Sequence, residues 1–155
     1  MPKEPELQNV LLPQRILILD SKTKREALLA LTDCLGTAPE VKDRDALAQG
    51  IFYREELMST GIGMGIAVPH VRLASVTDPV MCAGICRHPL TDYESLDGVP
   101  VRLIFMIAAG QHRHAEHLRL LSSLCSRFKS EKSRNALMSA PDTSTFYHIL
   151  IHPEK

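Results

Sequence analysis

His70 is the side chain in this sequence whose setting most strongly suggests chemistry. It follows a proline that ends a short apolar run at 66–68. Pro69 has no backbone N–H and pushes Val68 toward extended geometry, so a strand over 66–68 should end there. His70 is then expected just beyond the carboxyl end of a strand, where open α/β sheets commonly bind ligands. On this pattern alone, a purely structural histidine remains the alternative.

The segment before this strand is rich in glycine. Gly61, Gly63 and Gly65 alternate with other residues, so the chain can turn tightly here. The spacing superficially matches a dinucleotide fingerprint, but that motif follows a strand and opens a helix. Here the glycines follow a helical pattern and precede a strand, which argues against a nucleotide site.

Two further residues with useful chemistry lie far from His70 in the sequence. Arg54 precedes it by 16 residues (70 − 54) and His117 follows it by 47 (117 − 70). Arg54 is expected at the end of a helix and His117 in the first turn of another. Taken singly, Arg54 could be an exposed residue that pairs with a glutamate, and His117 a helix-capping surface residue.

The elements that must position these residues alternate between strand and helix. Apolar runs predict strands at 16–19, 66–68, 79–87 and 101–108. Helical spacing and capping residues predict helices from Asp20 or Ser21 to Gly36, from Pro39 to Met58, from about 114 to 128, from Ser130 or Ser133 to Ala140, and from Pro141 to Leu150. This order predicts a single α/β domain over 1–155, with an irregular N-terminal arm at 1–15.

Two of these helices have a face that is expected to be buried. In the second helix, the expected buried residues are Val41, Leu47, Ile51, Phe52, Leu57 and Met58. In the helix after 114 they are Leu118, Leu121, Leu124, Cys125 and Phe128.

Composition narrows the functional classes. The chain has 155 residues, 45% apolar and 23% charged, and its 18 basic and 18 acidic residues give a net charge of zero. A neutral chain gives no reason to expect a nucleic acid or a membrane surface as partner. The polar, proline-broken start and the absence of a long apolar run predict neither a signal peptide nor a membrane span, so a cytoplasmic protein is expected.

Cysteines and clustered histidines raise the question of a metal or redox site. Cys82 and Cys86 fall in an expected strand, where four residues span about 13 Å, too far for a disulfide or a shared metal. The four cysteines therefore fit reduced core thiols. His112, His114 and His117 could together hold zinc, but Arg113 places a positive charge among them. We expect no metal and no cofactor.

Five segments of the sequence resemble those of a known protein family. The segments that carry the resemblance are 54–56 (REE), 59–63 (STGIG), 65–70 (GIAVPH), 97–101 (DGVPV) and 117–121 (HLRLL). They look like the enzyme IIA domain, fructose/mannitol type, of the bacterial phosphoenolpyruvate-dependent sugar phosphotransferase system, which includes nitrogen-regulatory relatives. The resemblance covers about 16–150 and implies a mixed β-sheet flanked by helices on both faces.

The resemblance implies a role for each matching residue. His70 would carry a phosphoryl group, Arg54 would clamp the phosphoryl oxygens, and His117 would hydrogen-bond the phosphoryl group or orient His70. Ser59 and Thr60 could donate hydrogen bonds to the same group, with capping or turn roles as the alternative.

Partner binding is expected around His70. Ile62, Met64 and Leu73 are apolar residues in or beside the expected site, and some of them should be exposed as a docking patch. The residue after the reactive histidine is usually small in this family, but here it is Val71. A β-branched side chain at this position has the bulk to crowd the approach of a partner.

The function implied by the resemblance is that of a phosphocarrier. His70 would accept a phosphoryl group from the histidine-containing phosphocarrier protein and pass it to a IIB domain, as in sugar transport. The alternative is a regulatory binding protein of the nitrogen type, in which phosphorylation switches the partner that is held. A degenerate domain without phosphotransfer is the third hypothesis.

Overall fold

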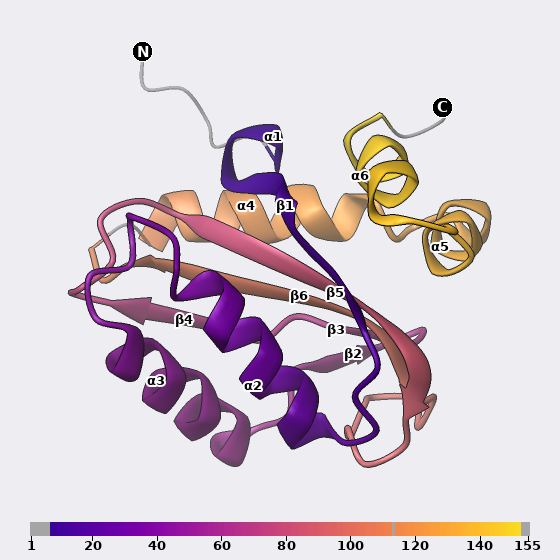
Figure 1. Ribbon diagram of the computed structural model, residues 1–155, viewed down its shortest axis with the longest axis horizontal. Coiled ribbons are helices and arrows are strands. Elements are labelled where there is room, and N and C mark those ends of the chain that lie inside the picture. Colours follow the sequence, from indigo (N-terminus) through magenta and orange to yellow (C-terminus); the bar gives the residue numbers. More distant parts are fainter. Residues whose placement is uncertain (1–6, 113, 153–155) are drawn as a thin grey trace.

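One mixed sheet separates two layers of helices (Figure 1). The computed structural model describes residues 7–112 and 114–152. Helices α2 (Lys24–Leu35) and α3 (Arg44–Leu57) cover one face of the sheet, whereas α1 (Leu7–Val10), α4 (His114–Ser126), α5 (Glu131–Met138) and α6 (Thr143–Ile151) cover the other. The predicted α/β class, with helices on both faces of a mixed sheet, is confirmed.

The sheet runs in the order β1 (Leu11–Leu19), β5 (Val80–Leu90), β6 (Val101–Gly110), β3 (Ile66–Ala67) and β2 (Gly61–Gly63), and β4 (His70–Leu73) also pairs with β6. β1 is parallel to β5, and β5 is antiparallel to β6. β3 and β4 both run parallel to β6, one after the other along its edge.

β6 is the central strand because its apolar run is buried on both faces. Arg102 is its only exposed residue. Successive side chains of a strand point to opposite faces, so β6 supplies both cores. Its residues Ile104, Met106 and Ala108 belong to the core under α2 and α3, whereas Leu103, Phe105 and Ile107 belong to the core under α1, α4, α5 and α6.

The strand before His70 does not end as predicted. β3 stops at Ala67, but pairing with β6 resumes at His70, the first residue of β4. Pro69 lacks a donor, yet its carbonyl still accepts a hydrogen bond from the Ile107 N–H at 2.9 Å. Pro69 therefore interrupts the ladder without turning the chain away from β6.

The predicted irregular arm over 1–15 is wrong for residues 7–15, and residues 1–6 lie outside the described part of the chain. Leu7, Val10 and Leu11 are buried, so they anchor α1 and the start of β1 in the core beneath α4. The pairing of β1 with β5 shifts register between Leu11 and Ile16, and this irregularity accommodates Pro13.

The helix faces also differ in part from the prediction. α3 begins after Asp43, whose carboxylate caps the helix by accepting the Ala46 N–H at 3.0 Å, and not at Pro39. Leu57 and Met58 were expected to be buried but are 65% and 68% exposed. Glu55 takes the buried position near the end of α3 instead.

In α4 the buried residues are His117, Leu120 and Leu124, while Leu118 and Cys125 are exposed. The buried face of α4 therefore differs from the predicted one. The prediction considered apolar residues only, and one of the buried positions is a histidine. Within residues 7–112 and 114–152, no helix is long and apolar enough to span a membrane.

Candidate phosphoryl-transfer site

Arg54, His70 and His117, which are far apart in the sequence, line one cleft of about 580 Å³. Arg54 comes from the last turn of α3, His70 from the first position of β4, and His117 from the first turn of α4. The fold thus brings the three predicted site residues together, although their roles are still expectations.

The His70 ring is fixed by a backbone carbonyl. Its Nδ1 lies 2.8 Å from the Val68 carbonyl oxygen. A carbonyl oxygen only accepts, so Nδ1 carries the proton and donates it. In the neutral ring, the unprotonated nitrogen with a lone pair is then Nε2. His70 is half-buried, and this nitrogen is the candidate nucleophile.

His117 packs against His70 as a neutral ring. The two ring centroids lie 5.2 Å apart, and His117 is only 3% exposed. Burial is the main cause that lowers the pKa of His117 to about 4, and electrostatic interactions with His70, Arg72 and His114 lower it further. Its Nδ1 is buried and has no hydrogen-bond partner among the described residues. An unpaired buried polar atom is costly, and such atoms often mark functional sites.

The lowered pKa of His117 predicts that acid destabilises the fold. Unfolding returns the pKa from about 4 to near 6.5, so the unfolded chain binds more protons between these values. The free energy of unfolding should therefore fall as the pH drops from 6.5 toward 4, by about 3 kcal/mol in total from this group. Urea unfolding across this range should show a shallower pH dependence for His117→Gln. The exposed His148→Gln serves as the control, and equal slopes for the wild type and His117→Gln would contradict the prediction.

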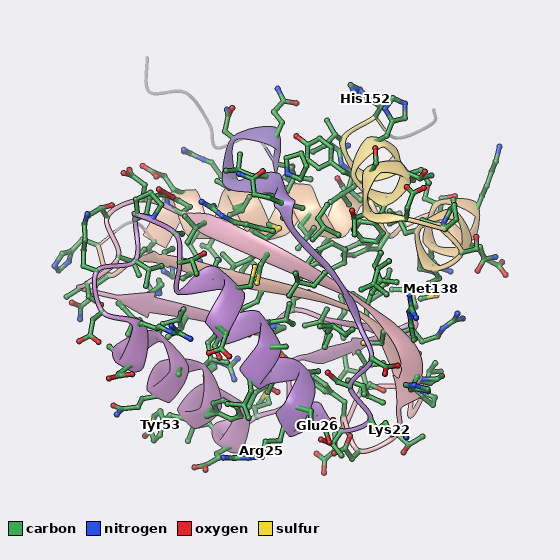
Figure 2. All side chains as sticks on the ribbon, viewed as in Figure 1. Lys22, Arg25, Glu26, Tyr53, Met138 and His152 are labelled. Carbon is green, nitrogen blue, oxygen red and sulfur yellow. The ribbon has the colours of Figure 1, made fainter. Side chains whose placement is uncertain are left out.

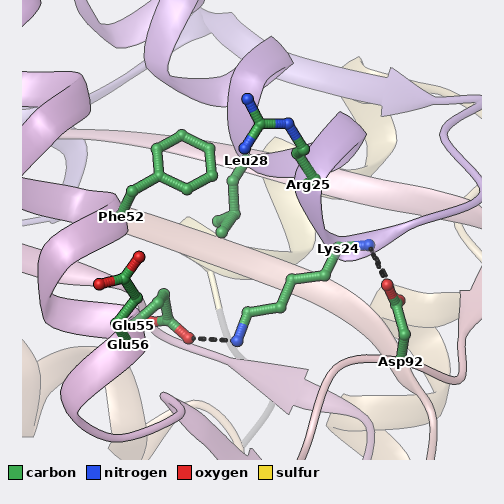
Figure 3. Close-up of a pocket in the computed structure, with 7 residues that line it drawn as sticks. All are labelled: Lys24, Arg25, Leu28, Phe52, Glu55, Glu56 and Asp92. Carbon is green, nitrogen blue, oxygen red and sulfur yellow. Dashed lines mark hydrogen bonds and ion pairs between the residues drawn. The ribbon is translucent and has the colours of Figure 1, made fainter.

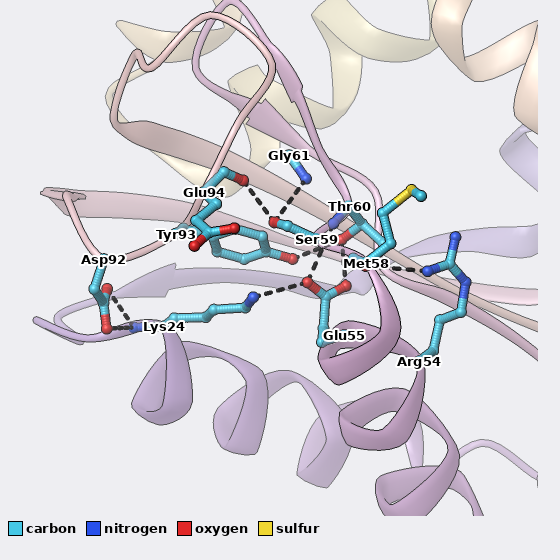
Figure 4. Close-up of polar contacts among 10 residues, drawn as sticks. All are labelled: Lys24, Arg54, Glu55, Met58, Ser59, Thr60, Gly61, Asp92, Tyr93 and Glu94. Carbon is cyan, nitrogen blue, oxygen red and sulfur yellow. Dashed lines mark hydrogen bonds and ion pairs between the residues drawn. The ribbon is translucent and has the colours of Figure 1, made fainter.

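Arg54 extends from the C-terminal turn of α3. Its Nη1 donates to the Met58 carbonyl oxygen at 3.0 Å, which ties the side chain to the chain just beyond the helix (Figure 4). A guanidinium has five N–H donors, so the remaining donors can still bind an anion in the cleft.

Glu55, the next residue, anchors the end of α3 from the buried side. Its carboxylate accepts the Thr60 N–H at 3.2 Å and pairs with Lys24 Nζ at 3.0 Å (Figure 4). The Thr60 hydroxyl donates to the same carboxylate, so the Tyr93 hydroxyl, 2.7 Å away, donates to Thr60. This network fixes the turn that carries Arg54.

The predicted phosphoryl contacts of Ser59 and Thr60 are not supported. Thr60 is buried, and its hydroxyl is held between Glu55 and Tyr93. Ser59 donates its hydroxyl to the Glu94 carbonyl oxygen at 2.5 Å. Neither residue lines the cleft, because both serve the turn after α3.

The predicted docking residues are only partly at the site. Leu73 lines the cleft, whereas Ile62 packs on the core under α4, and Met64, 41% exposed, donates its N–H to Asp97. The exposed apolar residues that do line the cleft are Tyr53, Leu57 and Leu118, with exposed fractions of 64%, 65% and 51%; Figure 2 labels Tyr53 beside α3. Sequence reasoning missed them because it assigned Leu57 and Leu118 to the core.

Val71, the residue after His70, packs against Gly50 of α3. A Cβ added at Gly50 in α3 would lie 2.9 Å from Cγ2 of Val71 and 3.5 Å from Leu73. The larger residue after His70 is thus matched by a glycine on the facing helix.

We expect Gly50→Ala and Val71→Ala to be coupled. An alanine in the middle of α3 should add about 1 kcal/mol of helix propensity, but the contact with Val71 should cost about 1–3 kcal/mol. With Val71→Ala present, only the gain should remain. Urea unfolding of both single variants and the double variant gives the coupling energy, and simple additivity would rule out this packing.

A second pocket, of about 320 Å³, lies between α2 and α3 and includes none of the predicted site residues (Figure 3). Lys24 spans it, with its Nζ on Glu55 and its backbone N–H on Asp92 at 2.9 Å. Lys24, Glu55 and Asp92 thereby join the two helices to the loop after β5.

The histidines near α4 are separated by the fold. His112 lines a different hollow with Ala74, whereas His114 and His117 line the cleft. His114 Nδ1 lies 2.6 Å from the Arg72 guanidinium. In the described part of the chain, no group of three or more His, Cys, Asp or Glu residues is arranged to hold a metal ion.

Comparison with known proteins relates this arrangement to one family. Residues 9–152 match the family described as phosphoenolpyruvate-dependent sugar phosphotransferase system, EIIA 2. The chain is 37% identical to the fructose-specific EIIABC component of Bacillus subtilis over 137 residues, 88% of this chain but 21% of that protein. It is 30% identical to the nitrogen regulatory protein of Pseudomonas aeruginosa over 94% of both chains. The structure of nitrogen regulatory protein IIA-Ntr from Neisseria meningitidis superposes with a TM-score of 0.85 at 28% identity, over 93% of this chain and 98% of that one.

Proposed function

The chain belongs to the EIIA 2 family of the phosphoenolpyruvate-dependent sugar phosphotransferase system, and we propose that it carries a phosphoryl group on Nε2 of His70. The observation that carries this proposal is the tautomer of His70. The Val68 carbonyl holds the proton on Nδ1 and leaves the lone pair of Nε2 for attack, in a cleft that also contains Arg54 and His117.

The transfer exchanges one N–P bond for another. Nε2 of His70 attacks the phosphorus of a donor phosphohistidine, the donor N–P bond breaks, and the donor imidazole keeps the electron pair of that bond. The Val68 carbonyl holds the Nδ1 proton throughout, and stabilises the positive charge that builds up on the ring. The same steps in reverse pass the group to the next acceptor.

The surrounding residues favour the transition state electrostatically. Phosphoryl transfer spreads negative charge over three equatorial oxygens, so fixed donors contribute most of the catalysis. Arg54 would bind two of these oxygens with its planar fork. His117, neutral because of its low pKa of about 4, would donate a single hydrogen bond without forming an ion pair that would trap the phosphoryl group.

The donor that we propose is the histidine-containing phosphocarrier protein, and the acceptor a IIB domain. The exposed Tyr53, Leu57 and Leu118 beside the histidines suit a transient protein contact. The second candidate function is regulatory binding controlled by phosphorylation. It is favoured by the similarity to the Pseudomonas nitrogen regulatory protein over 94% of both chains.

The test is phosphorylation by a reconstituted donor. The protein is incubated with phosphoenolpyruvate, the general phosphotransfer enzyme and the phosphocarrier protein, and the intact mass and the modified residue are determined. One phosphoryl group on His70 is expected, and phosphorus NMR should assign it to Nε2. Transfer onward to a IIB domain supports the carrier role, whereas partners retained only by one phosphorylation state support the regulatory one.

A further inference from the structure

Arg72, which the sequence analysis did not single out, lies in the same cleft as the histidines. We propose that Arg72 is a second guanidinium that binds the phosphoryl group, and that His114 holds it in place. This inference rests on the proposed transfer to His70 and adds a phosphoryl-binding residue and a positioning residue to it.

The register of β4 places Arg72 on the same side of the strand as His70. The two residues are two apart and pair with Ala109 and Ile107 of β6. Alternate residues of a strand share a face, so Val71 and Leu73 face the other way, toward Gly50 of α3. His70 and Arg72 therefore point together toward the start of α4, and both line the cleft.

His114 fixes the direction of the Arg72 side chain. Arg72 Nη1 lies 2.6 Å from Nδ1 of His114. A guanidinium can only donate, so His114 accepts at Nδ1 and is the neutral tautomer with its proton on Nε2. This contact holds an otherwise exposed arginine at the cleft. The rest of its fork of donors stays available, since only Nη1 has a contact with His114.

The charge balance of the cleft gives Arg72 its role. A phosphoryl group brings spread negative charge, and His117 is neutral. Arg54 also lines the cleft with its guanidinium, and one of its N–H groups donates to the Met58 carbonyl. Because Arg72 reaches the cleft from β4 and Arg54 from α3, two guanidiniums on separate elements can share the phosphoryl oxygens.

The first experiment compares Arg72→Gln with Arg87→Gln. Arg87 is exposed on β5 and does not line the cleft, so it matches the loss of charge without touching the site. Single-turnover transfer from the phosphorylated phosphocarrier is measured over a range of donor concentrations. Arg72→Gln should lower the saturating transfer rate about 10- to 100-fold with little change in half-saturation, and Arg87→Gln should match the wild type.

The second experiment isolates His114. His114→Ala removes the acceptor for Arg72, whereas His114→Asn keeps an amide oxygen close to the position of Nδ1. Transfer should slow at saturation in His114→Ala and recover most of the loss in His114→Asn. His114→Ala should have no further effect when Arg72→Gln is already present, because its role acts through Arg72.

The outcomes separate this inference from the proposed function. If the wild type gains no phosphoryl group on His70, the proposed function fails, and this inference fails with it. If the wild type is phosphorylated but Arg72→Gln transfers as fast as Arg87→Gln, only the inference about Arg72 is overturned. A change in half-saturation alone also overturns it, because Arg72 would then contact the partner and not the phosphoryl group.

Discussion

His70→Gln is expected to acquire no phosphoryl group from the phosphocarrier under conditions that fully modify the wild type. Glutamine is polar and similar in length to histidine, and it loses only the hydrogen bond from Nδ1 to the Val68 carbonyl, so the β3–β4 edge should stay folded. It has no nitrogen lone pair of imidazole character, so no N–P bond can form. Intact mass spectrometry should therefore detect no phosphorylated form of His70→Gln.

The control for this prediction is His88→Gln. His88 is exposed on β5 and contacts Asp20 at 3.0 Å, away from the cleft. The His88→Gln variant should be phosphorylated on His70 like the wild type. Its thermal unfolding temperature should be similar to that of His70→Gln. Phosphorylation of His70→Gln at the wild-type rate would show that another residue is the acceptor.

Arg54→Gln should slow phosphoryl transfer about 100- to 1,000-fold while leaving the protein folded. In the proposed transfer, this positive charge is needed mainly while the phosphoryl group moves between the two histidines. Its structural cost is one exposed hydrogen bond to the Met58 carbonyl, about 1 kcal/mol of unfolding free energy. Arg54→Lys should recover only part of the rate, because an ammonium cannot bind two oxygens with a planar fork.

Stopped-flow or quench-flow transfer from the phosphorylated phosphocarrier measures this effect. Arg44→Gln is the matched control, since Arg44 belongs to the same helix and forms an exposed ion pair with Asp33 at 2.6 Å. Such a surface pair contributes little to stability, and it does not line the cleft. Transfer by Arg54→Gln at the rate of Arg44→Gln would exclude the clamp role.

Some elements could be predicted from local sequence alone. β6 is nearly uninterrupted in apolar residues, and Ser130 and Asp142 cap α5 and α6 as their residue types suggest. These signals are local because a strand buried on both faces and a helix cap depend on near neighbours. The arm at 7–15 was missed because its burial depends on α4, more than a hundred residues away.

The sequence predicted some residues of the site but not others, because contacts between distant segments again decide which residues line it. Arg54, His70 and His117 were found through motifs that resemble a family, and the fold gathers them in one cleft. Ser59 and Thr60 have hydroxyls that could contact a phosphoryl group, with capping or turn roles as the alternative. Their hydroxyl partners, Glu94 and the Glu55–Tyr93 pair, come from chain segments that only folding brings near.

By itself, the sequence determined which groups can do chemistry: the imidazole after Pro69, a guanidinium near a helix end, and a second imidazole in a first turn. Only the tertiary structure decided how they are poised. The Val68 carbonyl leaves the lone pair on Nε2 of His70, burial lowers the pKa of His117, and pairing of β4 with β6 places Arg72 at the cleft. Tautomer, protonation and direction depend on partners and on solvent exclusion, and these exist only once distant segments have packed together.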